Sequence, residues 1–340
     1  MKKKGFFIGY LAENEDKFNG QTIRTRNVKR LLEEELGFSL STYDTIKLRK
    51  NPFSIISVLL NIRKFDSIFV LLAHRGVRLL LPLICFLGWR AKKKVYFIAI
   101  GGWLPEFAKK YYWIRWAIKR TSILFVQSKL MANLLQNLVP HLNIEILPNF
   151  KFYDFNTSIT KNESKNIKLV YISQVSLIKG IDTVEYLMRY CLQKSLPVTI
   201  DIYGPIKKED EGYFISMLSQ NSLIKYLGVL NDDRLFKTLA TYDLMIFPTH
   251  HLTEGFPGVI LDAFISGVPI LASKWNYGSE FVKKDFGLLY RHDDKEEALK
   301  HLLFLIENRE QLFKMKQAAY LNRDRYAVSQ IAKHLTSVGL

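Results

Sequence analysis

Two carboxylates in a segment made largely of glycine, proline and apolar residues are the first candidates for chemistry. Glu254 and Asp262 lie eight positions apart in THHLTEGFPGVILDAFISGVPILAS, the segment from Thr249 to Ser273. The neighbours of Asp262 from Val259 to Ile265 are all apolar, so a helix there has no broad solvated face. Because a buried carboxylate needs hydrogen-bonding partners, we expect Asp262 to accept hydrogen bonds from a bound group.

The elements around these carboxylates place them beside an anion site. DLMIFPT predicts a strand and PGVILDAFISG predicts a helix, so Glu254, Gly255 and Phe256 fall in the loop between them. This loop joins the carboxyl end of a strand to the amino end of a helix, where free N–H groups and the helix dipole favour an anion. Gly255 and Gly258 would let a ligand approach the backbone closely. Asp262 would lie about 7 Å further along the helix axis.

A nucleotide diphosphate sugar would suit this arrangement. Its diphosphate would lie at the amino end of the helix, its ribose hydroxyls at Asp262 and its sugar beside Glu254. The residues alone leave a second interpretation open, in which Asp262 is an acid favoured near a helix start and Glu254 is a solvated loop residue. A glycosidase would need two carboxylates facing one sugar, about 5–9 Å apart, which suits a carboxylate within an apolar helix less well.

Other chemistries find weaker support. The string HHLTE, from His250 to Glu254, could suggest a metal site, but it lacks the helical His-x-x-x-His spacing, and no metal site is predicted. GGW, at 101–103, is not a dinucleotide-binding fingerprint, so NAD is not expected. His74 ends the predicted strand SIFVLLAH and is a candidate for acceptor contact, with an ordinary loop or capping histidine as the alternative.

The whole chain predicts an α/β protein of two domains. Its 340 residues exceed what one core of ordinary size comprises. Amphipathic stretches alternate with ten short β-branched or aromatic runs, which indicates parallel sheets with helices on both faces. These runs are 5–11, 66–73, 94–101, 122–128, 144–150, 168–174, 197–204, 224–230, 243–249 and 268–273.

The polar segment Lys151–Lys168 predicts a linker. We therefore expect one domain at 1–155 and a second at 156–321, with the tail at about 322–340 packing back on the first. Ligands of such sheets bind outside the carboxyl ends of the strands.

Cysteine usage and hydropathy predict a cytoplasmic protein. Cys85 and Cys191 are far apart and lack metal-ligand spacing, which is typical of a reducing compartment. The basic start MKKKGFFIGYLAENEDK has a short apolar run followed by acids and predicts a strand, not a signal peptide. The apolar stretch Leu79–Trp89 is too short to span a bilayer.

The charge distribution points to an anionic partner of the first domain. Of the net charge of +17, residues 1–150 carry +15 and residues 151–340 carry +2. Base-reading motifs are lacking in the sequence, so nucleic acid is not expected, and an anionic membrane surface is the predicted partner.

Two further segments are assigned to this membrane side. In KKYYWIRWAIKR, from Lys109 to Arg120, Trp113 and Trp116 lie near cations, as in a helix in the lipid headgroup region, although a core helix with snorkelling cations is the alternative. In the helix predicted over QTIRTRNVKRLLEEEL, Arg24 and Arg26 crowd the amino end, against the helix dipole. We infer from this order that they serve an external anion.

Several strings resemble one family. EGFPGVILDAFISGVPILAS resembles the signature of the family-4 retaining glycosyltransferases, two acidic residues separated by seven others, followed by a Gly-Val-Pro strand. SQVSLIKG, from Ser173 to Gly180, matches in spacing the family's Gly-Arg-x-x-x-x-Lys-Gly segment. NGQT, from Asn19 to Thr22, is similar to a first-domain loop of relatives that build bacterial surface polysaccharides. VQSKLMANLL and ILPNF lie where the family has similar strings.

The resemblance implies a GT-B architecture, two Rossmann-like doubly wound parallel-sheet domains facing a cleft. The second domain would bind the nucleotide sugar, with no obligatory metal or other cofactor. Glu254 would lie at the reacting face of the donor sugar as the catalytic residue. The implied donor-binding residues are Gly20, Gln174, Lys179, Gly255, Phe256, Gly258, Val259 and Asp262, with Lys179 at the diphosphate and Asp262 at the ribose.

Three positions depart from the family pattern. Asp262 replaces the usual Glu and is one methylene shorter, yet it can still accept hydrogen bonds from ribose. Gln174 stands where the family has a phosphate-binding Arg, and a neutral amide cannot neutralise a diphosphate. Gly101 and Gly102 stand where many relatives have a His, so the acceptor-side role of that His is unassigned.

The sequence thus predicts a cytoplasmic, membrane-peripheral, retaining glycosyltransferase. It would move a sugar from a UDP- or GDP-sugar to a lipid-linked or cell-envelope acceptor in the synthesis of a surface polysaccharide such as capsule or exopolysaccharide. The alternative, which Gln174 supports, is a catalytically inactive relative that binds an active transferase.

Overall fold

The chain forms two compact units. The computed structural model describes residues 3–12, 20–161, 163–231 and 234–340. Unit 1 comprises Met1–Phe152 and Tyr326–Leu340, and unit 2 comprises Tyr153–Arg325. The division after Phe152 lies within the segment predicted as a linker, whose described residues 151–161 and 163 are without helix or strand.

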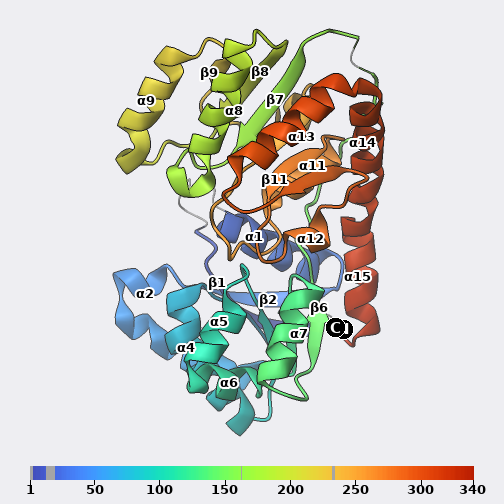
Figure 1. The fold of residues 1–340 in the computed structure, drawn as a ribbon. Coiled ribbons are helices and arrows are strands. Elements are labelled where there is room, and N and C mark those ends of the chain that lie inside the picture. Colours follow the sequence, from blue (N-terminus) through green and yellow to red (C-terminus); the bar gives the residue numbers. More distant parts are fainter. Residues whose placement is uncertain (1–2, 13–19, 162, 232–233) are drawn as a thin grey trace. The chain divides into compact units, whose positions relative to one another are not determined.

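Unit 1 is built on a six-stranded parallel sheet (Figure 1). The strand order is β2-β1-β3-β4-β5-β6. In the register of the central strand β1, Phe7 pairs with Thr42 on one side and Phe69 on the other. The strands are β1 (Lys3–Gly9), β2 (Phe38–Asp44), β3 (Ser67–Leu71), β4 (Lys94–Ile98), β5 (Ile123–Val126) and β6 (Ile144–Ile146).

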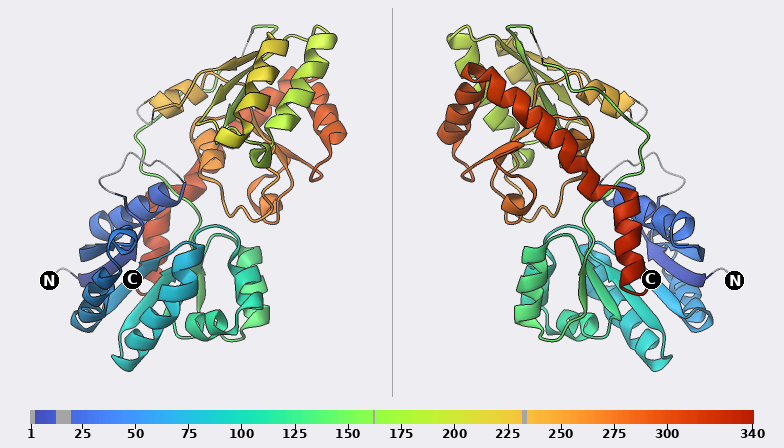
Figure 2. Two further views of the ribbon diagram at one scale, coloured as in Figure 1. Left: turned by 90° about the vertical axis from the view of Figure 1, so that its left-hand side faces the viewer. Right: turned by 90° about the vertical axis from the view of Figure 1, so that its right-hand side faces the viewer.

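Helices cover both faces of this sheet (Figures 1 and 2). They are α1 (Gly20–Glu34), α2 (Lys47–Lys50), α3 (Ile55–Lys64), α4 (His74–Arg90), α5 (Leu104–Lys110), α6 (Tyr112–Ile118), α7 (Lys129–Leu138) and α15 (Val328–Ser337). The helix α15 belongs to this unit because Ile331 and Leu335 are buried in the same apolar cluster as Phe7, Phe69 and Leu31.

Unit 2 has a second six-stranded parallel sheet, with the order β12-β11-β10-β7-β8-β9. The chain runs outward from β7 through β8 to β9, and it then returns to place β10 on the other side of β7. The order therefore reverses between β7 and β10. The strands are β7 (Ile167–Ile172), β8 (Val198–Tyr203), β9 (Ile224–Tyr226), β10 (Leu244–Phe247), β11 (Ile270–Ser273) and β12 (Gly287–Tyr290).

In the described part of unit 2, five α-helices lie between these strands in the sequence, and two follow the last strand, β12. They are α8 (Ile181–Gln193), α9 (Glu211–Gln220), α10 (Leu235–Leu239), α11 (Gly258–Ile265), α12 (Gly278–Phe281), α13 (Lys295–Glu307) and α14 (Arg309–Asn322). The apolar faces of α8, α9, α13 and α14 pack on the strands in one cluster that includes Leu169, Ile200, Val184 and Leu302.

The predicted α/β class and the parallel sheets are confirmed. All ten predicted runs contain strands, and the structure adds β2 and β12, each at the edge of its sheet. The prediction of one helix over Lys109–Arg120 is wrong. The backbone leaves the helical region at Tyr111 (φ −121°, ψ 110°), where α5 ends and α6 begins. Arg115 stabilises this break by donating hydrogen bonds to the carbonyls of Ala108 (2.7 Å) and Lys109 (3.0 Å).

Candidate functional site

The candidate site lies where the strand order of unit 2 reverses. β7 and β10 are paired in parallel, with Leu244 opposite Leu169, so their carboxyl ends meet at one edge of the sheet. In open α/β sheets this reversal point is where ligands bind. Two loops leave it, the β7–α8 loop (173–180) and the β10–α11 loop (248–257).

The two loops bring Lys179 and Glu254 together. Lys179 ends the short 3-10 helix Leu177–Lys179, and its Nζ forms an ion pair with Oε1 of Glu254. Both side chains are largely screened from solvent, with exposed fractions of 24% and 17%. The residues predicted to contact the diphosphate and the sugar thus lie side by side, although 75 positions separate them in the sequence.

The backbones of the loops also touch. Gly180 has φ 79°, in the left-handed region, and a Cβ added there would lie 1.9 Å from the carbonyl oxygen of Pro248. The backbone N–H of His250 donates to the carbonyl of Ile178 (3.0 Å). Only glycine permits such an approach at position 180. The position of Lys179 opposite Glu254 therefore depends on this close packing of the two loops.

Aromatic residues of other segments hold the β10–α11 loop in place. The indole N–H of Trp275 donates to the carbonyl of Gly255 (3.1 Å). The Phe256 ring is buried and stacks on Phe281, with ring centroids 4.2 Å apart and planes 7° apart. The structure therefore gives the Phe256 side chain a supporting position beneath the loop and not a contact with the predicted donor.

The amino end of α11 has room for a ligand. Pro257 precedes the helix in an extended conformation (φ −62°, ψ 132°), so α11 begins at Gly258. A Cβ added at Gly258 would meet no described atom within 4 Å. Val259 is half-buried beside it. The space beside this end leaves room for the anion that the sequence predicts at the backbone N–H groups of the first helical turn.

Asp262 is buried in α11, with 6% of its surface exposed. It is the fifth residue of the helix and lies among the buried residues Leu261, Ala263 and Phe264. The apolar surroundings that the sequence predicted are therefore present. Gln174, two residues beyond β7, is exposed at the same edge of the sheet, and its carbonyl accepts a hydrogen bond from the Tyr171 hydroxyl (3.0 Å).

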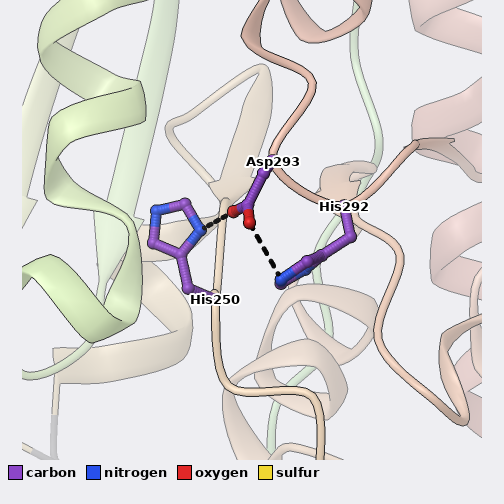
Figure 3. A group of neighbouring side chains, drawn as sticks. All are labelled: His250, His292 and Asp293. Carbon is purple, nitrogen blue, oxygen red and sulfur yellow. Dashed lines mark ion pairs between the residues drawn. The ribbon is translucent and has the colours of Figure 1, made fainter.

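A charged cluster at this edge was not predicted (Figure 3). His250 follows β10, and its two ring nitrogens face two carboxylates: Nε2 lies 2.9 Å from Oδ1 of Asp182, and Nδ1 lies 2.5 Å from Oδ1 of Asp293. Nε2 of His292 lies 3.3 Å from the second oxygen of Asp293. On the other side, Lys295 Nζ lies 2.5 Å from Oδ2 of Asp182.

These contacts shift the pKa values of the cluster. Burial opposes ionisation of Asp182, but the hydrogen bonds from His250 and Lys295 outweigh it and lower the pKa of Asp182 to about 2. The hydrogen bond to Asp182 raises the pKa of His250 above its ordinary value, and the charges of Asp182 and Asp293 add to this effect. The sequence suggested His250 only as a partner of Glu254, whereas the structure pairs it with residues from two other loops.

In unit 1, Arg24 differs from its prediction. Its guanidinium is buried and donates to the carbonyls of Leu147 (2.8 Å) and Pro148 (3.1 Å) and to Oδ1 of Asn149 (2.6 Å). Burial lowers the pKa of Arg24 to about 9. The expectation that Arg24 serves an external anion is therefore wrong, because this side chain ties α1 to the segment after β6.

The remaining predicted residues of unit 1 lie at its surface or partly within it. Arg26 is half-buried and donates to the carbonyls of Leu11 (2.9 Å) and Ala12 (2.7 Å). Gly20 begins α1 and is exposed, whereas Asn19 of the NGQT string lies outside the described residues. His74, also exposed, begins α4, and its ring centroid lies 3.9 Å from that of Trp103.

The two tryptophans predicted to face a membrane are both half-buried. The ring of Trp113 packs against Tyr111, with centroids 4.8 Å apart. The guanidinium of Arg120 lies 3.9 Å from the ring centroid of Trp116. Neither residue therefore projects freely from a single exposed helix as expected.

Comparisons with known proteins agree with this arrangement. Residues 154–322 match the family described as glycosyl transferases group 1, and they coincide closely with unit 2. Among curated protein sequences, none matches the chain. The matches to solved structures extend over both units.

Three solved structures illustrate the likeness. HepE from Anabaena, in complex with UDP-glucose, has a TM-score of 0.74 at 15% identity, covering 98% of each chain. Sucrose-phosphate synthase from Thermosynechococcus elongatus has a TM-score of 0.76 at 11% identity, covering 99% of this chain and 98% of its own. The pneumococcal O-GlcNAc transferase GtfA, with UDP and GlcNAc, has a TM-score of 0.62 at 14% identity over 84% of this chain and 58% of its own.

Identities this low show a shared fold, and the family match adds the type of domain. Residues 154–322 therefore match the model of a glycosyl transferases group 1 domain, and the chain has the two-sheet fold of GT-B glycosyltransferases.

Proposed function

We propose that this protein is a retaining glycosyltransferase that moves a sugar from a UDP- or GDP-sugar to a lipid-linked or cell-envelope polysaccharide acceptor. The observation that carries this proposal is the Lys179–Glu254 pair at the reversal point of the group 1 domain. The pair lies at the loop that leads into α11, because Glu254 precedes the first helical residue, Gly258, by four positions. HepE, whose structure resembles this chain, was solved with UDP-glucose, which supports a uridine nucleotide as the first donor to test.

The chemistry follows from where charge develops. When the glycosidic bond to the diphosphate breaks, negative charge grows on the leaving oxygen, and preorganised donors stabilise it. The ammonium of Lys179 has three N–H donors, so it can contact both Glu254 and a diphosphate oxygen. The N–H groups at Gly258 and Val259 supply further donors, so the proposed reaction needs no metal.

The remaining roles divide between nucleotide and sugar. Asp262 would accept hydrogen bonds from the ribose, and Glu254 would lie at the face of the donor sugar. Gln174 can donate a hydrogen bond to the diphosphate but adds no charge. Lys179 therefore carries more of the neutralisation than it would beside an arginine.

A melting-temperature screen against UDP-, GDP-, ADP- and CMP-sugars identifies the donor, since a ligand stabilises the state it binds. Transfer of radiolabelled sugar to a lipid extract then measures activity, and NMR of the product anomer tests retention. Binding without transfer or hydrolysis would support the inactive relative that Gln174 suggests. If none of the four nucleotide-sugar classes raises the melting temperature, the proposal is wrong.

We further propose that unit 1 docks on an anionic membrane surface. Among the described residues, seven large apolar side chains of α3, α4 and the turn before α3 are exposed: Phe53, Ile56, Leu60, Leu79, Leu83, Phe86 and Trp89. We call this set the apolar face. Leu79, Leu83 and Phe86 follow helical spacing on one side of α4, and α3 packs against α4.

Exposed cations lie on the same two helices as the apolar face. Arg63 and Lys64 end α3, and Arg75, Arg78 and Arg90 lie on α4. Apolar side chains flanked by basic ones are typical of proteins that lie in the headgroup region of anionic membranes. Within the part of the chain that the structure describes, no helix is long and apolar enough to cross a bilayer.

Vesicle binding tests this surface. Each large apolar side chain that enters the membrane contributes about 1.5–3 kcal/mol, so Leu79→Glu or Phe86→Glu should weaken binding to phosphatidylserine vesicles by at least about tenfold. The control is Leu321→Glu, which changes a similarly exposed leucine of unit 2. Binding should fall as salt rises. Equal loss in the control, or binding independent of salt, would refute the assignment.

A further inference from the structure

His250 lies where three loops of unit 2 meet. It follows β10 by three residues, Asp182 is the second residue of α8, and Asp293 follows β12 by three residues. Because the sheet is parallel, all three loops leave its carboxyl edge. The side chain of His250 therefore joins segments that are 68 and 43 positions away in the sequence.

Both ring nitrogens of His250 face carboxylate oxygens. A neutral imidazole has one N–H, so it can donate to only one of Asp182 and Asp293. Nε2 forms a hydrogen bond with Asp182, and the contact of Nδ1 with Asp293 is an attractive ion pair only when the ring is an imidazolium. The side chain of Asp182 is 22% exposed and that of Asp293 is 64% exposed, so the contact to Asp182 is the better shielded of the two.

The other charged groups around the ring complete this arrangement. Lys295 approaches the second oxygen of Asp182, and His292 approaches the second oxygen of Asp293. Each carboxylate is thus shared between His250 and one further base from the loop after β12 or the start of α13. The ring lies between the carboxylates of Asp182 and Asp293, and each carboxylate has a second basic partner.

The backbone of His250 reaches the candidate active site. Its N–H donates to Ile178, the residue before Lys179, and Pro248 touches Gly180. His250 therefore makes two connections. Its ring contacts α8 through Asp182, and its backbone N–H joins the β10–α11 loop to the β7–α8 loop. Movement of His250 would displace both Lys179 and the start of the β10–α11 loop that carries Glu254.

We propose that His250 is a positioning residue, clamped between Asp182 and Asp293, which sets Lys179 opposite Glu254 and so prepares the site for the donor diphosphate. This role rests on the proposed function, because the residues that the clamp positions are those of the proposed donor site. His250 itself need not touch the donor.

The clamp makes donor binding depend on pH. Hydrogen bonding raises the pKa of His250, so the clamp is complete below the ordinary histidine pKa of about 6.5 and is lost as pH rises through the folded-state pKa. Above that pKa the unprotonated nitrogen faces a carboxylate, and this contact becomes repulsive. The affinity for donor should therefore decline on the alkaline side.

The test is calorimetric titration with UDP-glucose from pH ~6 to pH ~9, a range that spans the titration of histidine. His250→Gln should bind UDP-glucose about tenfold more weakly at the acid end, as expected when a charge-assisted hydrogen bond is lost, and should lose the alkaline decline. Asp182→Asn should behave alike, while Asp293→Asn, with its exposed side chain, should change affinity less. The control is His251→Gln, the exposed neighbour, which should keep the wild-type profile.

The outcomes separate this inference from the proposed function. If the wild-type protein binds UDP-glucose but transfers no sugar, the proposed transferase activity is contradicted. The pH dependence of its UDP-glucose affinity still tests the clamp. If His250→Gln and Asp182→Asn both keep the wild-type affinity for UDP-glucose and its pH dependence, the clamp alone is overturned.

Metal binding is the competing use of these side chains. His250, His292 and Asp293 offer ligand atoms within 4.8 Å of one another. Stoichiometric zinc in the purified protein, lost in His292→Ala, would replace the clamp by a metal site and overturn the proposal. A melting temperature unchanged by zinc and by EDTA supports the clamp.

Discussion

Gly180→Ala tests the packing on which the donor site depends. The backbone at this position has φ 79°, and a residue with a Cβ costs about 1–2 kcal/mol in the left-handed region. The new methyl group would also lie 1.9 Å from the Pro248 carbonyl oxygen, far inside van der Waals contact, so the two loops must move apart. Overpacking of this kind costs a further ~1–3 kcal/mol. We expect a total loss of about 2–5 kcal/mol in the free energy of unfolding.

Urea unfolding of the whole protein measures this loss, and titration with UDP measures its effect on the site. The matched control is Gly212→Ala in α9, where a Cβ would meet no described atom within 4 Å. Alanine favours the helix there, so the control should be stabilised by about 0.5 kcal/mol. If Gly180→Ala is as stable as the control and binds UDP like the wild type, the loops do not touch at Pro248 and the reasoning fails.

Four further predictions concern single side chains. Glu254→Gln should keep nucleotide affinity within a few-fold while transfer falls steeply, and normal turnover with lost nucleotide binding would contradict this role. Asp262→Ala should weaken UDP binding by about 1–3 kcal/mol in calorimetry, whereas equal affinity would make Asp262 only an acid near a helix start. Lys316→Met should cost about 3 kcal/mol in urea unfolding, because it leaves the buried Asp243 without the ammonium 3.4 Å away, and an unchanged midpoint would argue against that pair. The raised pKa of His250 stabilises the fold below pH ~6.5 and ceases to do so as pH rises through it, so His250→Gln should flatten the pH dependence of unfolding.

The strands were predictable where they are buried. The strand β10 and the Phe6–Ile8 part of β1 are continuous buried apolar runs, because both faces of a parallel sheet are covered. The two strands that the sequence did not reveal are edge strands. β2 carries Ser39, Ser41 and Thr42 among its apolar residues, and β12 has only four residues. An edge strand needs less apolar surface, so its signal is weak.

The donor site was predictable in its residues but not in its contacts. The apolar helix around Asp262 and the glycines before it are local patterns. The burial of Arg24 depends on carbonyls more than 120 positions away, and the clamp on His250 depends on two other loops. Side-chain partners separated this far in sequence leave no local periodicity, so the polar residues among them look like ordinary surface groups.

The discontinuous path of unit 1 has a consequence for how the protein is made. Unit 2 is one uninterrupted segment, whereas the core of unit 1 includes Ile331 and Leu335, which the ribosome adds only after all of unit 2. At about 5–20 residues per second, the first part of unit 1 waits on the order of ten seconds or more for α15. During that interval the apolar surface that α15 will cover is open to chaperones or to premature association. Nascent chains of this protein should therefore depend on protection early in synthesis, and unit 2 should reach its native state first.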